Sequence, residues 1–224
     1  MPGGNIIIAL DRMSEKEALE LARMLSGKVW GFKVTDLLFE GVHIISQLKE
    51  FGNVFADAKL HDIPETVANS VKKLSMAGAD MITVHVSGGV DMIRAAKVNA
   101  KSSKIIGVTV LTSFDEETAS NIFGQSIEET VSRFVQYVYD AGADGVVSSC
   151  DELSLIKNMK ESKSLLTIAP GIRPTWFNKT DDQKRRATPK EAITLGADYI
   201  VIGRPITKSS NVIEALERII DEIR

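Results

Sequence analysis

Short apolar runs alternate with longer amphipathic segments along the whole chain. Runs rich in Ile, Val and Phe are typical of buried strands, and segments whose apolar residues recur every three or four positions are typical of helices. We assign strands to residues 6–10, 30–34, a third run that begins at 54, and 81–86, 105–111, 145–148, 165–169 and 199–202. The pattern therefore predicts eight strands that alternate with helices.

The segments between these runs carry helix boundary signals. Ser14 is followed three residues later by Glu17, the spacing of a capping box, which predicts a helix from 14 to about 26. Pro64 suits the start of the helix after the third strand, because the first turn of a helix needs no proline N–H. We expect further helices at 36–51, 90–99, 127–140 (after a polar loop) and 152–160, and from about 189 and 208.

A short sequence recurs before three of the strands. Ala-Gly-Ala-Asp or Leu-Gly-Ala-Asp occupies residues 77–80, 141–144 and 195–198. Glycine can end a helix in the left-handed backbone conformation. We interpret this sequence as a local connection from helix to strand and not as a long repeat.

Eight consecutive strand–helix units favour an α/β fold, a single (β/α)8 TIM barrel, with an open doubly wound sheet as the alternative. No proline- or serine-rich linker divides the chain, and 224 residues is an ordinary length for an undivided α/β barrel. We therefore expect one catalytic domain over residues 1–224.

Charge and cysteine content narrow the functional classes. The net charge of −3 and the pI near 5.7 argue against a surface for nucleic acid or an anionic membrane, but they leave room for a local basic pocket. Cys150 is the single cysteine, so an intrachain disulfide and a cysteine metal cluster are excluded. The chain has no signal-peptide pattern and no apolar run near the ~18 residues of a membrane span, so we expect a cytoplasmic protein.

The most informative stretch is the motif Asp-Ala-Lys-Leu-His-Asp-Ile-Pro at residues 57–64, which follows the apolar run 54–56. Residues two apart on a strand share a face, so Asp57 and Lys59 are expected to point the same way, with Asp62 in the loop beyond. Charges persist in a buried strand when they are paired or serve a reaction. This acid–lysine–acid array indicates a catalytic electrostatic site.

Further polar residues fall at strand ends, where the active sites of parallel barrels lie. Asp11 follows a predicted strand, and Lys33 and His85 fall near the ends of theirs. For Asp11 or His85 alone, ordinary hydrogen bonding to neighbours is an equally good interpretation. Lys33, Asp57 and Lys59 together favour a site, because three charges then share one rim.

Two segments late in the chain suit phosphate. They are Ala169-Pro170-Gly171-Ile172-Arg173 after the seventh strand and Ile202-Gly203-Arg204-Pro205 after the eighth. Glycine lets backbone N–H groups approach an anion, arginine adds a charged fork, and these two loops are the usual phosphate position of such barrels. Two ordinary tight turns are the alternative. The long polar loop 174–188 is interpreted as a lid from which Gln183 could reach a bound phosphate.

Metal catalysis has little support in the sequence. None of the three histidines, His43, His61 and His85, shows a ligand spacing such as His-x-x-x-His, and we interpret them as structural. Carboxylates at 57 and 62 could hold magnesium, but Lys59 between them competes for the same space. Dinucleotide-binding, Walker and serine-triad motifs are also absent from the sequence.

These residues resemble the orotidine 5′-phosphate decarboxylase family over essentially the whole chain. The resemblance rests on Ala9-Leu10-Asp11, Lys33, the motif at 57–64, Pro170-Gly171-Ile172-Arg173 and Gly203-Arg204-Pro205-Ile206. It implies a homodimeric barrel that converts orotidine monophosphate to UMP and carbon dioxide with no metal or organic cofactor.

The resemblance also implies a role for each matching residue. Lys59 would protonate carbon 6 of the pyrimidine as carbon dioxide leaves, Asp57 would lie beside the substrate carboxylate, and Asp62 of the other subunit would complete the charge network with Lys33. After Leu111-Thr112, family members often place a small hydroxyl residue against the pyrimidine amide. We assign this contact to Ser113, with Phe114 and Asp115 as alternatives in register. The remaining implied contacts are Asp11 and Lys33 for the ribose, Ile63 and Thr66 reaching in from the partner, and Pro170, Gly171, Ile172, Arg173, Gln183, Gly203 and Arg204 around the phosphate.

Two other interpretations use the same barrel. Enzymes resembling 3-keto-gulonate 6-phosphate decarboxylase and hexulose-phosphate synthase share the Asp-x-Lys-x-x-Asp pattern, but they bind magnesium and tend to carry a glutamate where this chain has Lys33. The ending Asp-Ile-Pro at 62–64 also fits the orotidine branch better than their usual Asp-Ala-Gly. A catalytically silent phosphate-binding protein would have no use for an intact acid–lysine–acid set.

Overall fold

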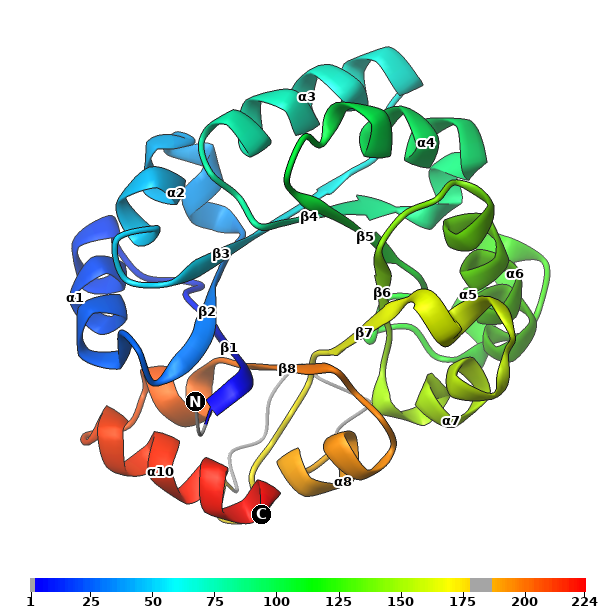
Figure 1. The fold of residues 1–224 in the computed structure, drawn as a ribbon. Coiled ribbons are helices and arrows are strands. Elements are labelled where there is room, and N and C mark those ends of the chain that lie inside the picture. Colours follow the sequence, from blue (N-terminus) through cyan, green and yellow to red (C-terminus); the bar gives the residue numbers. More distant parts are fainter. Residues whose placement is uncertain (1–2, 178–186) are drawn as a thin grey trace.

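Eight parallel strands close into a barrel in the computed structural model, which describes residues 3–177 and 187–224. Each strand pairs with the next along the chain, and β8 (Tyr199–Ile202) pairs back to β1 (Gly3–Ala9). In Figure 1 the strands form the inner ring and the helices lie outside it. The closed ring confirms the predicted TIM barrel and excludes the open sheet, which would leave two unpaired edge strands.

The remaining elements follow in alternation. The other strands are β2 (Val29–Val34), β3 (Asn53–Leu60), β4 (Met81–His85), β5 (Lys104–Val108), β6 (Gly145–Val147) and β7 (Leu166–Ala169). The α-helices are α1 (Glu15–Leu25), α2 (His43–Leu48), α3 (Pro64–Met76), α4 (Gly89–Asn99), α5 (Glu116–Phe123), α6 (Ile127–Asp140), α7 (Cys150–Asn158), α8 (Pro189–Thr194), α9 (Arg204–Thr207) and α10 (Val212–Ile223). Short 3-10 turns are η1 (Asp36–Phe39), η2 (Val86–Gly88) and η3 (Glu161–Ser164).

Several predicted boundaries are confirmed. The N–H of Glu17 donates to Ser14 Oγ at 3.4 Å, and the N–H of Ser14 donates to the Glu17 carboxylate at 2.8 Å, which is the predicted capping box of α1. Pro64 is the first residue of α3. The glycines of the recurring sequence adopt positive φ angles, as expected for a left-handed helix end: Gly78, Gly142 and Gly196.

Three predicted segments are wrong in detail. The helix expected over 36–51 is split into η1 and α2, because the chain turns at Gly41 with a φ of +146°. The polar loop expected before 127 contains α5, which Asp115 caps and Gly124 ends in the left-handed conformation. The last helix begins at 212 instead of near 208. Asn211 caps it, because its side-chain oxygen accepts the backbone N–H of Glu214.

Apolar side chains pack on both faces of the barrel wall. On β1, Ile6 and Ile8 belong to the large cluster between strands and helices, and Ile7 belongs to a second cluster inside the barrel. The interior cluster consists of Ile7, Ala9, Phe55, Met81, Ile106, Ile168 and Val201, with Trp30 and Tyr199 packed against it. These side chains fill the interior below the carboxyl ends of the strands.

The aspartates of the recurring sequence tie the amino end of the barrel together. Asp80 accepts the backbone N–H of Val54 at 2.7 Å and pairs with Lys49 at 2.8 Å. The same arrangement recurs at Asp144 with Ile105 and Lys97, and at Asp198 with Thr167 and Lys157. These structural ion pairs lie at the opposite end from the strand-end charges singled out above. None of the described helices combines the length and apolar character that crossing a bilayer requires.

Candidate active site

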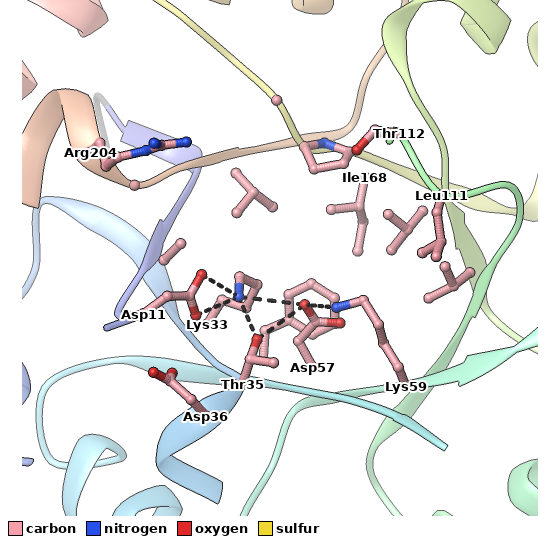
Figure 2. Close-up of a pocket in the computed structure, with 18 of the residues that line it drawn as sticks. Asp11, Lys33, Thr35, Asp36, Asp57, Lys59, Leu111, Thr112, Ile168 and Arg204 are labelled. Atoms are coloured by element: carbon pink, nitrogen blue, oxygen red, sulfur yellow. Dashed lines mark hydrogen bonds and ion pairs between the residues drawn. The ribbon is translucent and has the colours of Figure 1, made fainter. Parts of the chain in front are cut away.

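A cavity of about 460 Å³ opens at the carboxyl ends of the strands. Figure 2 shows Asp11, Lys33, Asp57 and Lys59 in a row along one side of it, with Arg204 on the opposite side. The row draws on three neighbouring strands, because Asp11 follows β1, Lys33 lies on β2, and the other two lie on β3. The structure therefore brings together four charges that are spread over nearly fifty positions of the sequence.

The four charges alternate in sign. Lys33 Nζ lies 2.9 Å from Asp11 Oδ1 and 3.4 Å from Asp57 Oδ2, and Lys59 Nζ lies 2.5 Å from the same Asp57 oxygen. Thr35 Oγ1 accepts a hydrogen bond from Lys33 Nζ at 2.7 Å and donates one to Asp57 Oδ2 at 3.3 Å. Each charge thus has an oppositely charged neighbour, which is what allows Lys33 and Asp57, in the middle of the row, to be buried.

Burial and charge oppose each other within this row. The side chains of Lys33 and Asp57 are only 9% and 10% exposed. Burial disfavours the ionised Asp57, but Lys33 and Lys59 outweigh it, and they hold the pKa of Asp57 below its ordinary value. Burial likewise disfavours the charge on Lys33, but Asp57 and Asp11 raise its pKa above the usual value. Both groups are therefore charged at neutral pH.

An irregularity in β3 aims two of these side chains at the cavity. The register between β3 and β4 shifts between Ala56 and Leu60. Within the shifted stretch, Lys59 has a φ of +46°, in the left-handed region that residues other than glycine seldom adopt. Bulges of this kind redirect side chains next to active sites. The alternation of side chains along a strand predicted that Asp57 and Lys59 point the same way. The 2.5 Å distance between Lys59 Nζ and Asp57 Oδ2 confirms that the two side chains meet.

The loops after β7 and β8 form the opposite side of the cavity. Gly171 has a φ of +77°, which glycine adopts without steric cost. The backbone N–H of Arg173 donates to the carbonyl of Ala187 at 2.8 Å, so the two ends of the long loop meet beside the cavity. The predicted phosphate-binding residues that line the cavity are Pro170, Gly171, Arg173, Gly203 and Arg204. Two arginines beside glycine-containing turns are suited to an anion.

Apolar side chains cover the wall between the charged row and the arginines. They are Phe55, Val108, Val110, Leu111, Val147, Ile168 and Val201. An apolar lining lowers the local dielectric constant and so strengthens the electrostatic effect of the charged row on a bound molecule. The cavity thus offers an anion site at one side, an apolar middle and a fixed charge array at the other side.

Some predicted contact residues lie away from this cavity. Ile172 is fully buried and forms an isolated bridge with Ala187. Ser113 is exposed, and its neighbour Thr112 lines the cavity. Gln183 lies outside the described residues.

The predicted cross-subunit residues also lie away from the cavity of their own chain. Asp62, Ile63 and Thr66 are all exposed on the segment that follows β3. Asp62 Oδ1 accepts the backbone N–H of Ile63 at 2.7 Å. In the single subunit, Asp62 is therefore not part of the charged row.

Several cavity residues were not predicted from the sequence. They are Arg12, Thr35, Asp36, Thr112, Ser148 and Thr207. Asp36 accepts the backbone N–H of Arg12, whose φ is +59°, at 2.8 Å. The strand-end rule that identified Lys33 applies equally to the two polar residues that follow β2, so it could have found Thr35 and Asp36.

The donor set of the cavity does not suit a divalent metal. Among residues 3–177 and 187–224, no three His, Cys, Asp or Glu side chains converge in a way that could hold one. The ammonium groups of Lys33 and Lys59 both approach Asp57 Oδ2, where a metal would have to bind. Of the histidines, His43 pairs with Glu15 at 2.8 Å, and the rings of His61 and His85 lie 5.7 Å apart.

Sequence and structure comparisons agree on one family. The model described as "Orotidine 5'-phosphate decarboxylase / HUMPS family" matches residues 4–219. The orotidine 5'-phosphate decarboxylase of Dichelobacter nodosus (strain VCS1703A) is 43% identical over 222 residues, covering 96% of each chain, and that of Dictyoglomus thermophilum is 42% identical over 232 residues, covering 97% of this chain and 94% of its own. The crystal structure of orotidine 5'-phosphate decarboxylase from Lactobacillus acidophilus matches with a TM-score of 0.82 at 33% identity, covering 99% of each chain.

Proposed function

The chain belongs to the orotidine 5'-phosphate decarboxylase / HUMPS family, and we propose on that basis that it converts orotidine 5'-monophosphate to UMP and carbon dioxide in pyrimidine nucleotide synthesis. The observation that carries the proposal is the alternating row Asp11, Lys33, Asp57 and Lys59 beside an apolar cavity. We propose that residues 1–224 act as one catalytic domain. We also place the enzyme in the cytoplasm, in keeping with its free, buried Cys150.

The charged row provides what this decarboxylation needs. The substrate carboxylate would lie beside Asp57, whose negative charge disfavours it more than the neutral carbon dioxide that forms. As the bond from carbon 6 to the carboxylate breaks, carbon dioxide leaves and the electron pair stays on carbon 6. Lys59 donates one ammonium proton to that carbon and regains a proton from solvent. A fixed cation beside a forming carbanion needs no electron sink, and each ~1.4 kcal/mol of preferential transition-state stabilisation raises the rate tenfold.

The rest of the cavity fits a nucleoside monophosphate. Its volume of about 460 Å³ lies within the usual range for small-molecule sites. Asp11 and Lys33 would hold the ribose hydroxyls, and Ser113 or its cavity-lining neighbour Thr112 would contact the pyrimidine amide. The phosphate would be held by Arg173 and Arg204, with Pro170, Gly171, Ile172, Gly203 and Gln183 around it. Binding energy from the phosphate can raise the rate by fixing the distant ring in its reactive position.

A magnesium-dependent reaction on a sugar phosphate is the other chemistry found on this barrel. Lys33 argues against it, because its ammonium group lies 3.4 Å from the carboxylate that a metal would need and would repel a divalent cation. The curated relatives described above also carry the decarboxylase name. We therefore favour a reaction that uses neither a metal nor an organic cofactor.

We further propose that the active enzyme is a homodimer. Ile63 is a large apolar residue that is 66% exposed, four positions after the cavity-lining Lys59 and next to the exposed Asp62. An exposed apolar side chain beside a carboxylate is suited to contact with a second copy of the chain. In the dimer, Asp62 would extend the charged row of the partner's cavity, and Ile63 and Thr66 would close the ribose side.

Subunit mixing tests the shared site. Lys59→Ala and Asp62→Ala are expected to be nearly inactive when assayed separately. After the two variants are mixed and allowed to exchange subunits, each mixed dimer has one site with both residues intact, so activity should recover to about 25% of wild type. If Asp62 acts within its own subunit, the mixture stays as inactive as its components.

Substrate choice tests the reaction itself. The purified protein should consume orotidine 5'-monophosphate and form UMP in excess EDTA. The loss of the orotate absorbance measures this turnover. A keto-sugar phosphate with added magnesium should give no product. No turnover in EDTA, together with activity on the sugar phosphate once magnesium is present, would overturn the proposal.

A further inference from the structure

We propose that Thr83 on β4 is a positioning residue for the decarboxylation, because its hydroxyl group holds both the backbone of Lys59 and the carboxylate of Asp57. The inference rests on the proposed function, since it assigns to Thr83 the task of presenting those two side chains to the substrate. Thr83 is fully buried and is not among the residues that line the cavity. Its effect on a bound substrate therefore has to pass through other side chains.

The position of Thr83 follows from the bulge in β3. Ala56 pairs with Ile82, and Leu60 pairs with Val84. Three residues of β3, 57–59, thus lie opposite the single residue Thr83. The extra residues cannot all use the regular ladder of backbone hydrogen bonds, so their polar groups need other partners.

The Thr83 hydroxyl supplies those partners. The backbone N–H of Lys59 donates to Thr83 Oγ1 at 2.8 Å, and Thr83 Oγ1 donates to Asp57 Oδ1 at 2.9 Å. The direction of both bonds is fixed, because an amide N–H can only donate and a hydroxyl group has one proton to give. The hydroxyl group thus accepts a hydrogen bond from Lys59 on one side and donates its proton to Asp57 on the other.

The bond to Lys59 matters because of its backbone conformation. With a φ of +46°, Lys59 occupies a region that a side chain disfavours, and the conformation persists only where its surroundings hold it. The hydrogen bond to Thr83 satisfies the Lys59 N–H in that conformation. Without it, the residue is freer to relax, and its ammonium group would lose its fixed direction.

The bond to Asp57 fixes the plane of the carboxylate. Lys33, Lys59 and Thr35 all approach one oxygen, Oδ2. Thr83 holds the other oxygen, Oδ1. A carboxylate held at both oxygens cannot rotate about its axis, so Thr83 sets the angle at which the negative charge faces the substrate. A misplacement of about 1 Å in an active site can lower the rate about 100-fold.

Replacement of the hydroxyl tests the inference. Thr83→Val keeps the branched shape of the side chain and removes both hydrogen bonds, and Thr83→Ala is a second variant without the hydroxyl. Loss of hydrogen bonds to a charged group predicts a fall in kcat of about 10- to 100-fold. The KM for orotidine 5'-monophosphate and the inhibition constant of UMP should stay within about twofold of wild type, because Thr83 does not touch the cavity. Thr83→Ser, which keeps the hydroxyl, should restore kcat to within about threefold of wild type.

Thr167→Val is the matched control. Thr167 is also fully buried on a barrel strand, and its hydroxyl donates to the carboxylate of Asp198 at 2.9 Å. That carboxylate lies at the amino end of the barrel, so the control should lose stability and keep kcat. Provided that wild type turns over the substrate, either of two results would overturn the inference alone. One is a kcat of Thr83→Val and Thr83→Ala equal to that of wild type, and the other is a kcat of Thr83→Ser as low as that of these two variants. An inert wild-type protein would overturn the proposed function as well.

Discussion

Replacement of Lys33 by methionine removes a buried cation that lies between two carboxylates. Lys33 Nζ is 2.9 Å from Asp11 and 3.4 Å from Asp57, and only 9% of the lysine side chain is exposed. Methionine has a flexible apolar side chain of similar length, so the substitution removes the charge with little change in packing. Asp57 then stays buried with less positive charge around it.

The expected cost follows from this geometry. Two unit charges 3.4 Å apart interact by ~5 kcal/mol at an effective dielectric constant of ~20. Removal of one partner from a buried pair costs about 3–5 kcal/mol in practice. We expect the free energy of unfolding of Lys33→Met to fall by about 3–5 kcal/mol at pH 7. We also expect kcat/KM for orotidine 5'-monophosphate to fall at least ~100-fold, because the fixed electrostatic field is broken.

The pKa shifts give the pH window of this stability loss. The pKa of Asp57 is lowered in the folded protein, so the ionised carboxylate stabilises the fold above the pKa of the unfolded chain, ~3.9. This stabilisation is lost as the pH falls through the pKa of the folded protein. The pKa of Lys33 is raised in the folded protein, so the charged ammonium group stabilises the fold below the pKa of the unfolded chain, ~10.4. This stabilisation is lost as the pH rises through the pKa of the folded protein. The variant should therefore be most deficient between about pH 5 and 10.

Urea unfolding at pH 7 and pH 3 measures this deficit. Lys72→Met, at an exposed position of α3, serves as the control and should lose less than about 0.5 kcal/mol. Adding Asp57→Asn to Lys33→Met should recover part of the lost stability, because it removes the unpaired buried charge. A deficit below about 1 kcal/mol at pH 7, or an equal deficit at both pH values, would refute the reasoning.

Three further predictions concern other parts of the barrel. Arg204→Ala should lower kcat/KM for orotidine 5'-monophosphate about 100-fold and leave the slow turnover of the nucleoside orotidine unchanged, as steady-state kinetics on both substrates would show. Asp198→Asn should reduce the free energy of unfolding by about 1 kcal/mol without changing kcat, since the pair with Lys157 is partly exposed. Because the pKa of Asp198 is lowered, the difference in unfolding free energy between this variant and wild type should disappear as the pH falls below ~3.9, as urea unfolding would show. Ser14→Ala removes the cap of α1 and should cost about 1 kcal/mol in the same assay, with kcat unchanged.

Much of the fold could be predicted because its signals are local. The apolar runs identify the eight strands, and the capping box at Ser14 and the proline at 64 mark helix starts. The break at Gly41 was missed because the residues around it are compatible with one continuous helix. Helix α5 was missed because it is short and polar, although its cap Asp115 and its terminal Gly124 are ordinary boundary signals.

The charged row could be predicted because charge at a strand end is unusual. The bulge in β3 could not, because no residue type marks it: Lys59, the residue at positive φ, is neither glycine nor asparagine. Thr83 was missed for a related reason, since threonine is common in strands and its hydroxyl gains meaning only beside Asp57. The cross-subunit role of Asp62 rests on the family resemblance and stays a prediction, because a contact with another subunit leaves no pattern in the local sequence.

The most direct test of the account is the rate at which Lys59→Ala releases carbon dioxide from orotidine 5'-monophosphate in excess EDTA. Wild type and an exposed-lysine control, Lys72→Ala, should both be active under these conditions. Lys59→Ala should be slower by at least ~1,000-fold while still binding UMP, because the proton donor and the cation beside carbon 6 are lost together. A Lys59→Ala enzyme within about tenfold of wild type would contradict the assignment of Lys59 as the proton donor.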